Sequence, residues 1–217
     1  MEQTIDFYSS SRVISPFKEM AAYEAIWARD KINFKRIAEL FNKHPHSLPS
    51  CFVTKDEIKE YSTLLEKKLF SNQHIYPNVI INNTFDYPQK LRDAISPIEV
   101  LYYSGHIEFL DTKGIAIVGS RKPTANGLAR AKKLVKLLVK DDITIFSGLA
   151  EGIDSIAHMT AIENKGRTVA VIGTPLNEFY PKQNKDLQLY IANKHLLISQ
   201  VPFIKYSQQD YRWNRSF

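Results

Sequence analysis

The sequence predicts an α/β protein in which a Rossmann-like parallel sheet of about four core strands follows a small helical domain. Two observations support this fold class. From residue 113 onward, short apolar runs alternate with helical segments, which is typical of β-α-β units. Before residue 75, apolar residues recur at helical spacing instead. We therefore divide the chain into a helical module (1–75), a connecting region with short strands (76–112) and a partial Rossmann-like domain (113–217).

The helical module contains three predicted helices. Residues 19–29 and 34–42 carry apolar side chains three or four positions apart. Thr54 and Glu57 have the spacing of a capping box, which begins a third helix running to about Leu69. In the connecting region, prolines separate two apolar runs that predict short strands, at 79–81 and 100–103.

The second half of the chain alternates regularly between strands and helices. Ile115 to Val118 is a continuous apolar run, as expected for a strand covered on both faces. The elements that follow are a helix at 125–140, a strand at 143–146, a helix at 153–164, a strand at 168–172, a helix at 184–193 and a strand at 196–198. We expect a doubly wound sheet. With the strand order 3-2-1-4, the last strand would form an apolar edge that invites pairing. We expect that edge to be covered by the N-terminal region, by a second copy or by further residues of a longer protein.

The positive charge is concentrated in the second half of the chain. The net charge is +6, with 13 Lys and Arg against 14 Asp and Glu in residues 1–110, and 16 against 9 in residues 111–217. This asymmetry fits either a polyanionic partner or a basic surface that only keeps the domain soluble. There is no secretory signal and no apolar stretch long enough to cross a membrane, so a cytoplasmic protein is expected. The lone Cys51 excludes an internal disulfide and a cysteine-based zinc site.

Three loops after consecutive strands are the candidate ligand site. In parallel α/β sheets, ligands bind beyond the carboxyl ends of the strands, where glycines and helix N-termini present free N–H groups. The residues that we expect to bind phosphates in these loops are Gly119, Ser120, Arg121, Lys122, Ser147, Gly148, Gly152, Lys182, Asn184 and Lys185. Arg121 offers a planar fork for phosphate oxygens, whereas the lysines are point charges. Glycine after a strand is common, and one such loop would be structural, but three such loops at the same end of the sheet favour an anion site.

Other site types do not fit the residues. The first loop lacks the G-x-G-x-x-G series of dinucleotide-binding proteins, and no Walker sequence is present. Asp154 and His158 lie four residues apart on one helix, where they are expected to cap and pair rather than to catalyse. His44 and His46 lack a second pair of metal ligands. We therefore expect no catalytic residues, no metal and no cofactor.

The C-terminal stretch from Tyr206 to Phe217 interleaves aromatic residues with Arg212 and Arg215. Proteins that bind single strands use this combination, with bases stacked on rings and guanidinium groups on the backbone. A terminal segment whose Trp213 packs onto the sheet would have the same composition. Both interpretations remain open from the sequence.

At these loops the sequence resembles the DNA-processing protein A family, also called DprA or Smf. The segments that carry the resemblance are Val118-Gly119-Ser120-Arg121, then Ser147-Gly148-Leu149-Ala150-Glu151-Gly152-Ile153-Asp154 with His158, the Tyr180-Pro181 loop and, upstream, Asp86-Tyr87-Pro88 and Leu101-Tyr102-Tyr103-Ser104-Gly105. The resemblance covers about residues 79–215. The family's Phe-Pro-x-Arg-Asn-Arg segment and the strands after it are missing, and we interpret the chain as stopping just before that segment.

The resemblance implies a non-enzymatic protein that binds single-stranded DNA and helps to load a RecA-type recombinase, as in natural transformation. Arg121 would be the family's DNA-contacting arginine, and Lys182 or Lys185 its lysine after the Tyr-Pro pair. The family's homodimer contacts lie largely in the missing part, so a homodimer of this chain is not the leading expectation, and no membrane partner is expected. The alternative is a small-nucleotide sensor or a nucleotide-processing enzyme on the same sheet.

Overall fold

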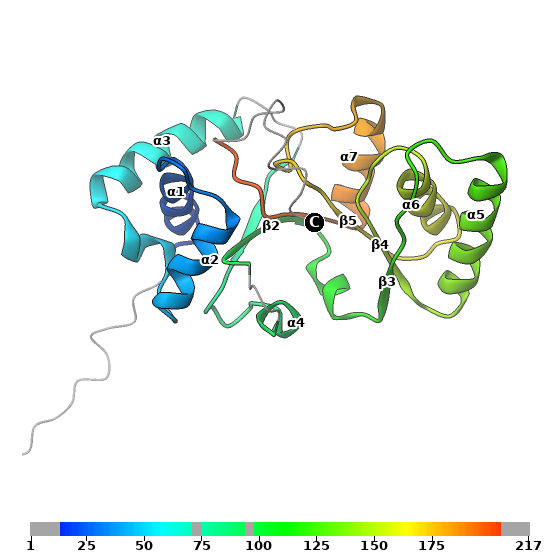
Figure 1. The fold of residues 1–217 in the computed structure, drawn as a ribbon, viewed down its shortest axis with the longest axis horizontal. Helices are drawn as coiled ribbons and strands as arrows, with labels where there is room; N and C mark the ends of the chain where they lie inside the picture. Colours follow the sequence, from blue (N-terminus) through cyan, green and yellow to red (C-terminus); the bar gives the residue numbers. More distant parts are fainter. Residues whose placement is uncertain (1–13, 71–74, 94–97, 205–217) are drawn as a thin grey trace, which may run out of the picture.

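The computed structural model describes residues 14–70, 75–93 and 98–204. A helical module lies at one end of the elongated molecule, and the sheet extends from it toward the helix that follows the first parallel strand (Figure 1). None of the helices in the described ranges combines the length and apolarity needed to cross a membrane.

The helical module is built around α1 (Pro16–Trp27), against which α3 (Lys55–Phe70) packs. Every residue of α1 from Glu19 onward is buried, while in α2 (Phe34–Lys43) Ile37 and Phe41 are buried and Phe34 and Leu40 pack against the same cluster. The predicted capping box begins α3. The Thr54 amide donates to Glu57 Oε2 at 2.7 Å, and the Glu57 amide donates to Thr54 Oγ1 at 3.2 Å.

The sheet has six strands in the order β1-β2-β6-β5-β4-β3. They are β1 (Asn78–Ile81), β2 (Val100–Gly105), β3 (Gly114–Ala116), β4 (Thr144–Ser147), β5 (Thr168–Val171) and β6 (Leu196–Ser199). The four strands β3 to β6 are parallel, which confirms the predicted Rossmann-like core. The two strands of the connecting region are antiparallel and join the same sheet through the pairing of β2 with β6.

The expected strand order was wrong. The core strands follow one another in chain order, so β3 lies at the end of the described sheet and β6 lies inside it. The apolar run of β6 is covered, as expected, but by β2 of the connecting region, with Tyr103 opposite Ile198.

The doubly wound arrangement was also wrong, because the three crossover helices pack on one face. They are α5 (Ala125–Lys140), α6 (Ile153–Glu163) and α7 (Lys185–Lys194). Val135 of α5 and Ala157 of α6 pack with Ile145, while Ile191 of α7 belongs to the same cluster as Ala170 and Leu197. Right-handed crossovers that always add the next strand on the same side must place their helices on one face.

The opposite face of the sheet is covered differently. Its residues, among them Val169, Leu196 and Ile198, pack under the short α4 (Gln89–Arg92) and the 3₁₀ helix η2 (Ile107–Asp111) through Leu91, Ile107, Phe109 and Leu110. This cover does not reach the strand at the end of the sheet, where Ala116, the register partner of Phe146 on this face, is exposed. The end of the sheet nearest β3 is therefore open on this face.

A buried carboxylate joins the helical module to the segment after β6. Glu24 of α1 is fully buried and accepts hydrogen bonds from the amides of Phe203 (2.7 Å) and Ile204 (3.0 Å). The Tyr102 hydroxyl donates to the same carboxylate at 3.4 Å, and the Tyr102 and Phe203 rings meet edge to face. Burial raises the pKa of Glu24 to about 7, although the two amide donors act in the opposite direction.

Candidate nucleic-acid interface

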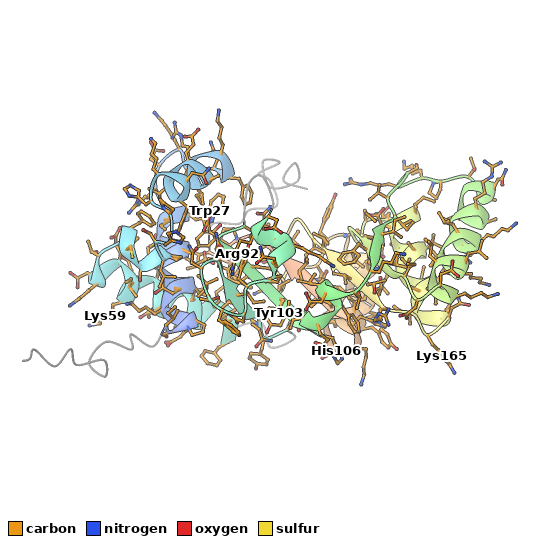
Figure 2. The ribbon with its side chains drawn as sticks, turned by 90° about the horizontal axis from the view of Figure 1, so that it is seen from below. Trp27, Lys59, Arg92, Tyr103, His106 and Lys165 are labelled. Carbon is orange, nitrogen blue, oxygen red and sulfur yellow. The ribbon has the colours of Figure 1, made fainter. Side chains whose placement is uncertain are left out.

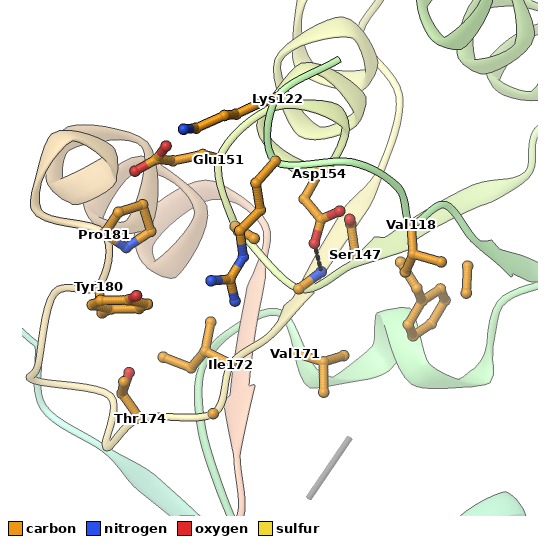
Figure 3. A pocket seen from close by; sticks show the side chains of 16 residues that line it. Val118, Lys122, Ser147, Glu151, Asp154, Val171, Ile172, Thr174, Tyr180 and Pro181 are labelled. Carbon is orange, nitrogen blue, oxygen red and sulfur yellow. Dashed lines mark hydrogen bonds between the residues drawn. The ribbon is translucent and has the colours of Figure 1, made fainter. Parts of the chain in front are cut away.

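The three predicted loops converge at the carboxyl ends of β3, β4 and β5. They enclose an open cavity of about 530 Å³, which we call the crown cavity (Figure 3). Its lining residues are Ala116, Val118, Arg121, Lys122, Phe146, Ser147, Gly148, Ala150, Glu151, Asp154, Val171, Ile172, Gly173, Thr174, Tyr180 and Pro181. The sequence prediction that these loops meet at one end of the sheet is thus confirmed.

The first loop rests directly on the start of α6. Gly152 has φ +80°, and a Cβ atom there would lie 2.3 Å from the Ser120 carbonyl oxygen. That carbonyl accepts a hydrogen bond of 3.2 Å from the Ile153 amide. A side chain at Gly119 would likewise meet Ile153 at 2.7 Å. These glycines therefore permit close contact between two loops.

Several backbone amides in these loops already have hydrogen-bond partners. The Gly148 amide donates to Asp154 Oδ2 at 3.1 Å, the Ser155 amide donates to the Ala150 carbonyl at 3.2 Å, and the Lys122 amide donates to Ser120 Oγ at 3.1 Å. These three amides are therefore not available to an anion in the crown cavity.

Two cationic side chains of the first loop are available for that role. Arg121 and Lys122 are exposed and line the crown cavity. Neither side chain forms a hydrogen bond or an ion pair with any other residue of the described ranges. Arg121 can offer its full set of guanidinium donors to phosphate oxygens.

The predicted residues of the third loop divide into different roles. Lys182 is exposed at the start of the 3₁₀ helix η3 (Lys182–Asn184). Asn184 is a brace, because its amide group donates to the Leu149 carbonyl and to Ser155 Oγ, both at 2.8 Å. Lys185 Nζ lies 5.1 Å from the centre of the Phe179 ring. The Asn184 side chain therefore ties the third loop to the second.

The crown cavity also contains two carboxylates. Asp154 is only 6% exposed and holds the second loop through the Gly148 amide. Glu151 accepts a hydrogen bond from the Gln183 side chain. Figure 3 shows Lys122 and Glu151 on the same side of the cavity. The cavity has mixed charge, with its cations unpaired and its carboxylates bonded to neighbouring loops.

One wall of the crown cavity is apolar, which sequence reasoning did not include in the site. Ala116, Val118, Phe146 and Val171 form this wall, and Val118 is 73% exposed. Tyr180, which is 49% exposed, lies on the other side of the cavity (Figure 3). The available signal was the alternation of strand side chains, which turns Phe146 and Val171 away from the helix-covered face.

The expected pairing of Asp154 with His158 was wrong. His158 is fully buried, and its Nδ1 lies 2.7 Å from Thr168 Oγ1, whose hydroxyl donates to the Ile145 carbonyl at 2.9 Å. Nδ1 must therefore be the donor to Thr168. Burial lowers the pKa of His158 to about 3, so the ring is neutral. His158 therefore helps α6 to pack on the sheet, whereas Asp154 holds the second loop through the Gly148 amide.

The remaining predicted site residues, Arg212 and Arg215, lie outside the described residues. Within the described ranges, no three His, Cys, Asp or Glu side chains gather where they could hold a metal ion.

A Rossmann-like sheet with a cationic and apolar cavity at the carboxyl ends of its strands is the arrangement of α/β proteins that bind nucleotides or nucleic acids. The chain belongs to the DNA recombination-mediator protein A family, whose model matches residues 78–215. The match covers the whole sheet, including the two strands of the connecting region.

Known relatives agree with this assignment. DNA processing protein DprA of Streptococcus pneumoniae is 44% identical over 114 residues, which is 52% of this chain and 40% of that protein. Protein Smf of Synechocystis is 32% identical over 202 residues, covering 83% of this chain and 51% of that protein. The chain thus spans about half the length of these relatives, or less.

Two solved structures are similar to the fold. The X-ray structure of DprA from Streptococcus pneumoniae matches with a TM-score of 0.66 and 27% identity, over 92% of this chain and 71% of that one. DNA processing protein A from Helicobacter pylori, whose single-stranded DNA binding mode has been studied structurally, matches with a TM-score of 0.56 and 26% identity. That match covers 64% of this chain and 62% of the Helicobacter chain.

Proposed function

We propose that this chain binds single-stranded DNA in the crown cavity, as a DNA-processing protein of its family. The proposal rests on one observation. Arg121 and Lys122, whose side chains have no hydrogen-bond or ion-pair partner among the described residues, line the same cavity as an apolar wall. Proteins that bind single strands combine cations that follow the backbone with apolar and aromatic surfaces that receive bases. The reported DNA binding mode of the Helicobacter pylori relative supports the same ligand class.

The geometry supports the following division of roles. Arg121 and Lys122 hold phosphates at the rim, with Lys182 as a further cation of the third loop. Val118 and Phe146 form the surface against which a base packs, and Tyr180 faces them across the cavity. Gly119, Ser120, Ser147, Gly148 and Gly152 shape the loops, and Asn184 keeps the third loop against the second.

We further propose that the chain acts by binding rather than by catalysis. Asp154 and His158, the residues in this region best suited to acid–base chemistry, are both committed to structural hydrogen bonds. The biological role that we propose is cytoplasmic DNA processing in transformation and recombination, in which the bound strand is passed to a RecA-type recombinase.

A direct test compares Arg121→Glu with the matched control Lys59→Glu. Both substitutions reverse an exposed positive charge, and Lys59 lies on α3 in the helical module (Figure 2). Fluorescence anisotropy with a labelled oligothymidylate should show affinity about tenfold weaker or worse for Arg121→Glu, because the variant cannot form the charge-assisted hydrogen bond to phosphate. The log–log salt slope should also fall by ~0.7 for each phosphate that the variant no longer neutralises. An unchanged affinity in a folded Arg121→Glu protein would refute this site.

The second candidate function is a small-nucleotide sensor, and the volume of the crown cavity supports it. About 530 Å³ lies within the range of small-molecule pockets. Calorimetry with a mononucleotide and with oligonucleotides of increasing length separates the two functions. Affinity that grows with length supports strand binding, whereas tight mononucleotide binding without length dependence supports the sensor.

A further inference from the structure

The outer side of α5 carries a concentration of positive charge that the crown cavity does not use. Residues 113–140 contain eight Lys and Arg and no Asp or Glu. Five of them lie on α5 and are all exposed: Arg130, Lys132, Lys133, Lys136 and Lys140. None of these five side chains has a hydrogen bond or an ion pair with another described residue.

Helical periodicity gathers four of these cations on one stripe. With 3.6 residues per turn, Arg130, Lys133, Lys136 and Lys140 project from the side of α5 that lies opposite the buried Ala131 and Val135. We call these four residues the α5 stripe. At 1.5 Å per residue the stripe is ~15 Å long, which is about four phosphates at the spacing of one strand of B-DNA.

The α5 stripe continues the surface of the first loop. Helix α5 begins at Ala125, three residues after Lys122, and Thr124 caps it by accepting from the Gly127 amide at 3.1 Å. The helix then runs along the end of the molecule farthest from the helical module (Figure 1). A DNA strand that leaves the crown cavity past Arg121 and Lys122 would reach the α5 stripe next.

Helix stability alone does not account for this charge. Cations near a helix C-terminus interact favourably with the helix dipole, but only Lys140 lies in the last turn of α5. The acidic side chain of Asp142, just beyond the helix, is paired with Arg167 at 2.8 Å and so does not neutralise the stripe. Four like charges on one face repel one another unless an anion binds them.

Resting on the function proposed above, we infer that the α5 stripe is a second contact for the DNA backbone. The crown cavity fixes one short segment of the strand, and the stripe holds the phosphates that follow. Because surface cations bind phosphates without reading bases, this contact extends the binding site in length and adds no sequence preference.

The test is the triple variant K133Q/K136Q/K140Q, with K55Q/K59Q/K67Q on α3 as control. Both variants remove three exposed positive charges and keep good helix formers, and circular dichroism checks that each is folded. Anisotropy is measured on oligothymidylates of about 4 and about 20 nucleotides, at several salt concentrations. Arg121→Glu is measured beside them.

For the α5 variant we expect unchanged binding of the short strand and about tenfold weaker binding of the long one. The salt slope on the long strand should fall by ~2, because three phosphates at ~0.7 each are no longer neutralised. The α3 control should bind both strands like the original protein. Two results would refute the α5 stripe as a DNA contact: equal loss of affinity for the short and long strands, or the same loss in the α3 control. Either result would mean that the net charge of the protein explains the loss of affinity.

The two proposals can fail separately. If Arg121→Glu weakens binding of both strands while the α5 variant binds the long strand as the original protein does, the crown cavity is supported as a binding site and the α5 stripe is refuted. If the α5 variant weakens the long strand while Arg121→Glu changes nothing, the cavity is refuted and the stripe is the main site. Absence of binding to any strand at low salt refutes both.

Discussion

Gly152 is the position where one added methyl group should separate the first loop from the second. Its φ of +80° and ψ of −118° form a conformation that residues with a side chain rarely adopt. In Gly152→Ala the new Cβ would also lie 2.3 Å from the Ser120 carbonyl oxygen and 2.8 Å from that of Arg121. Both are backbone atoms, so no side chain can rotate aside. Strain and overpacking together should lower the free energy of unfolding by about 2–4 kcal/mol.

Gly127→Ala is the matched control for this substitution. Gly127 lies in the first turn of α5, where the nearest atom to a new Cβ is Thr124 Oγ1 at 3.4 Å, an ordinary contact. Alanine should therefore stabilise the protein by about 0.5–1 kcal/mol through its helix preference. Urea unfolding followed by circular dichroism measures both variants. The reasoning is refuted if Gly152→Ala stays within about 0.5 kcal/mol of the original protein.

Two further predictions concern buried polar groups. Burial raises the pKa of Glu24 from 4.5 to about 7, so the unfolded chain loses this proton at lower pH than the folded protein does. Glu24 should then contribute a fall of about 3 kcal/mol in the free energy of unfolding between pH 4.5 and 7, and Glu24→Gln should remove this contribution in urea titrations; an unchanged pH dependence in the variant would contradict this. In the variant, Glu99, whose pKa is also raised to about 7 by burial, still lowers stability as the pH rises, while His158, whose pKa burial lowers to about 3, acts in the opposite direction. Asn184→Ala leaves the Leu149 carbonyl without its side-chain donor and should cost about 1–3 kcal/mol in the same assay, whereas a neutral result would show that the brace contributes nothing.

Local features of this fold can be predicted from the sequence because their causes are local. The helix predicted at 125–140 has those bounds in the structure, since Thr124 caps it and apolar residues recur at helical spacing. The Thr54–Glu57 capping box forms as expected. The convergence of the three loops follows from parallel pairing alone, because the carboxyl ends of parallel strands lie at one end of a sheet.

Strand order cannot be predicted in the same way. Each parallel strand of this core is a short apolar run, and such a run does not indicate which other strand it will pair with. The choice depends on how α5, α6 and α7 share one face and on the presence of β2 beside β6. These are contacts between segments far apart in the chain, which no local pattern encodes.

The chemistry of the site is predictable only in part, for a related reason. The position of Arg121 and Lys122 at the cavity can be predicted because they follow the first parallel strand, whose carboxyl end faces the ligand side of the sheet. Gly148 was expected to bind the ligand, whereas in the structure its amide donates to Asp154 Oδ2. A glycine in the sequence shows that the backbone can approach a neighbour closely, and it does not show which neighbour.

The position of β3 at the end of the described sheet connects the two proposed contacts. A strand order of 3-2-1-4 would have placed this strand in the middle, with β6 against it. In the observed order no strand of the described sheet lies beyond β3, so Val118 remains 73% exposed and becomes part of a cavity wall. The same position puts α5 at the end of the helix layer, where it packs against α6 and β4. The apolar wall and the basic stripe therefore share one topological cause, and variants of Val118 and of Lys133 should affect the same bound strand at successive nucleotides.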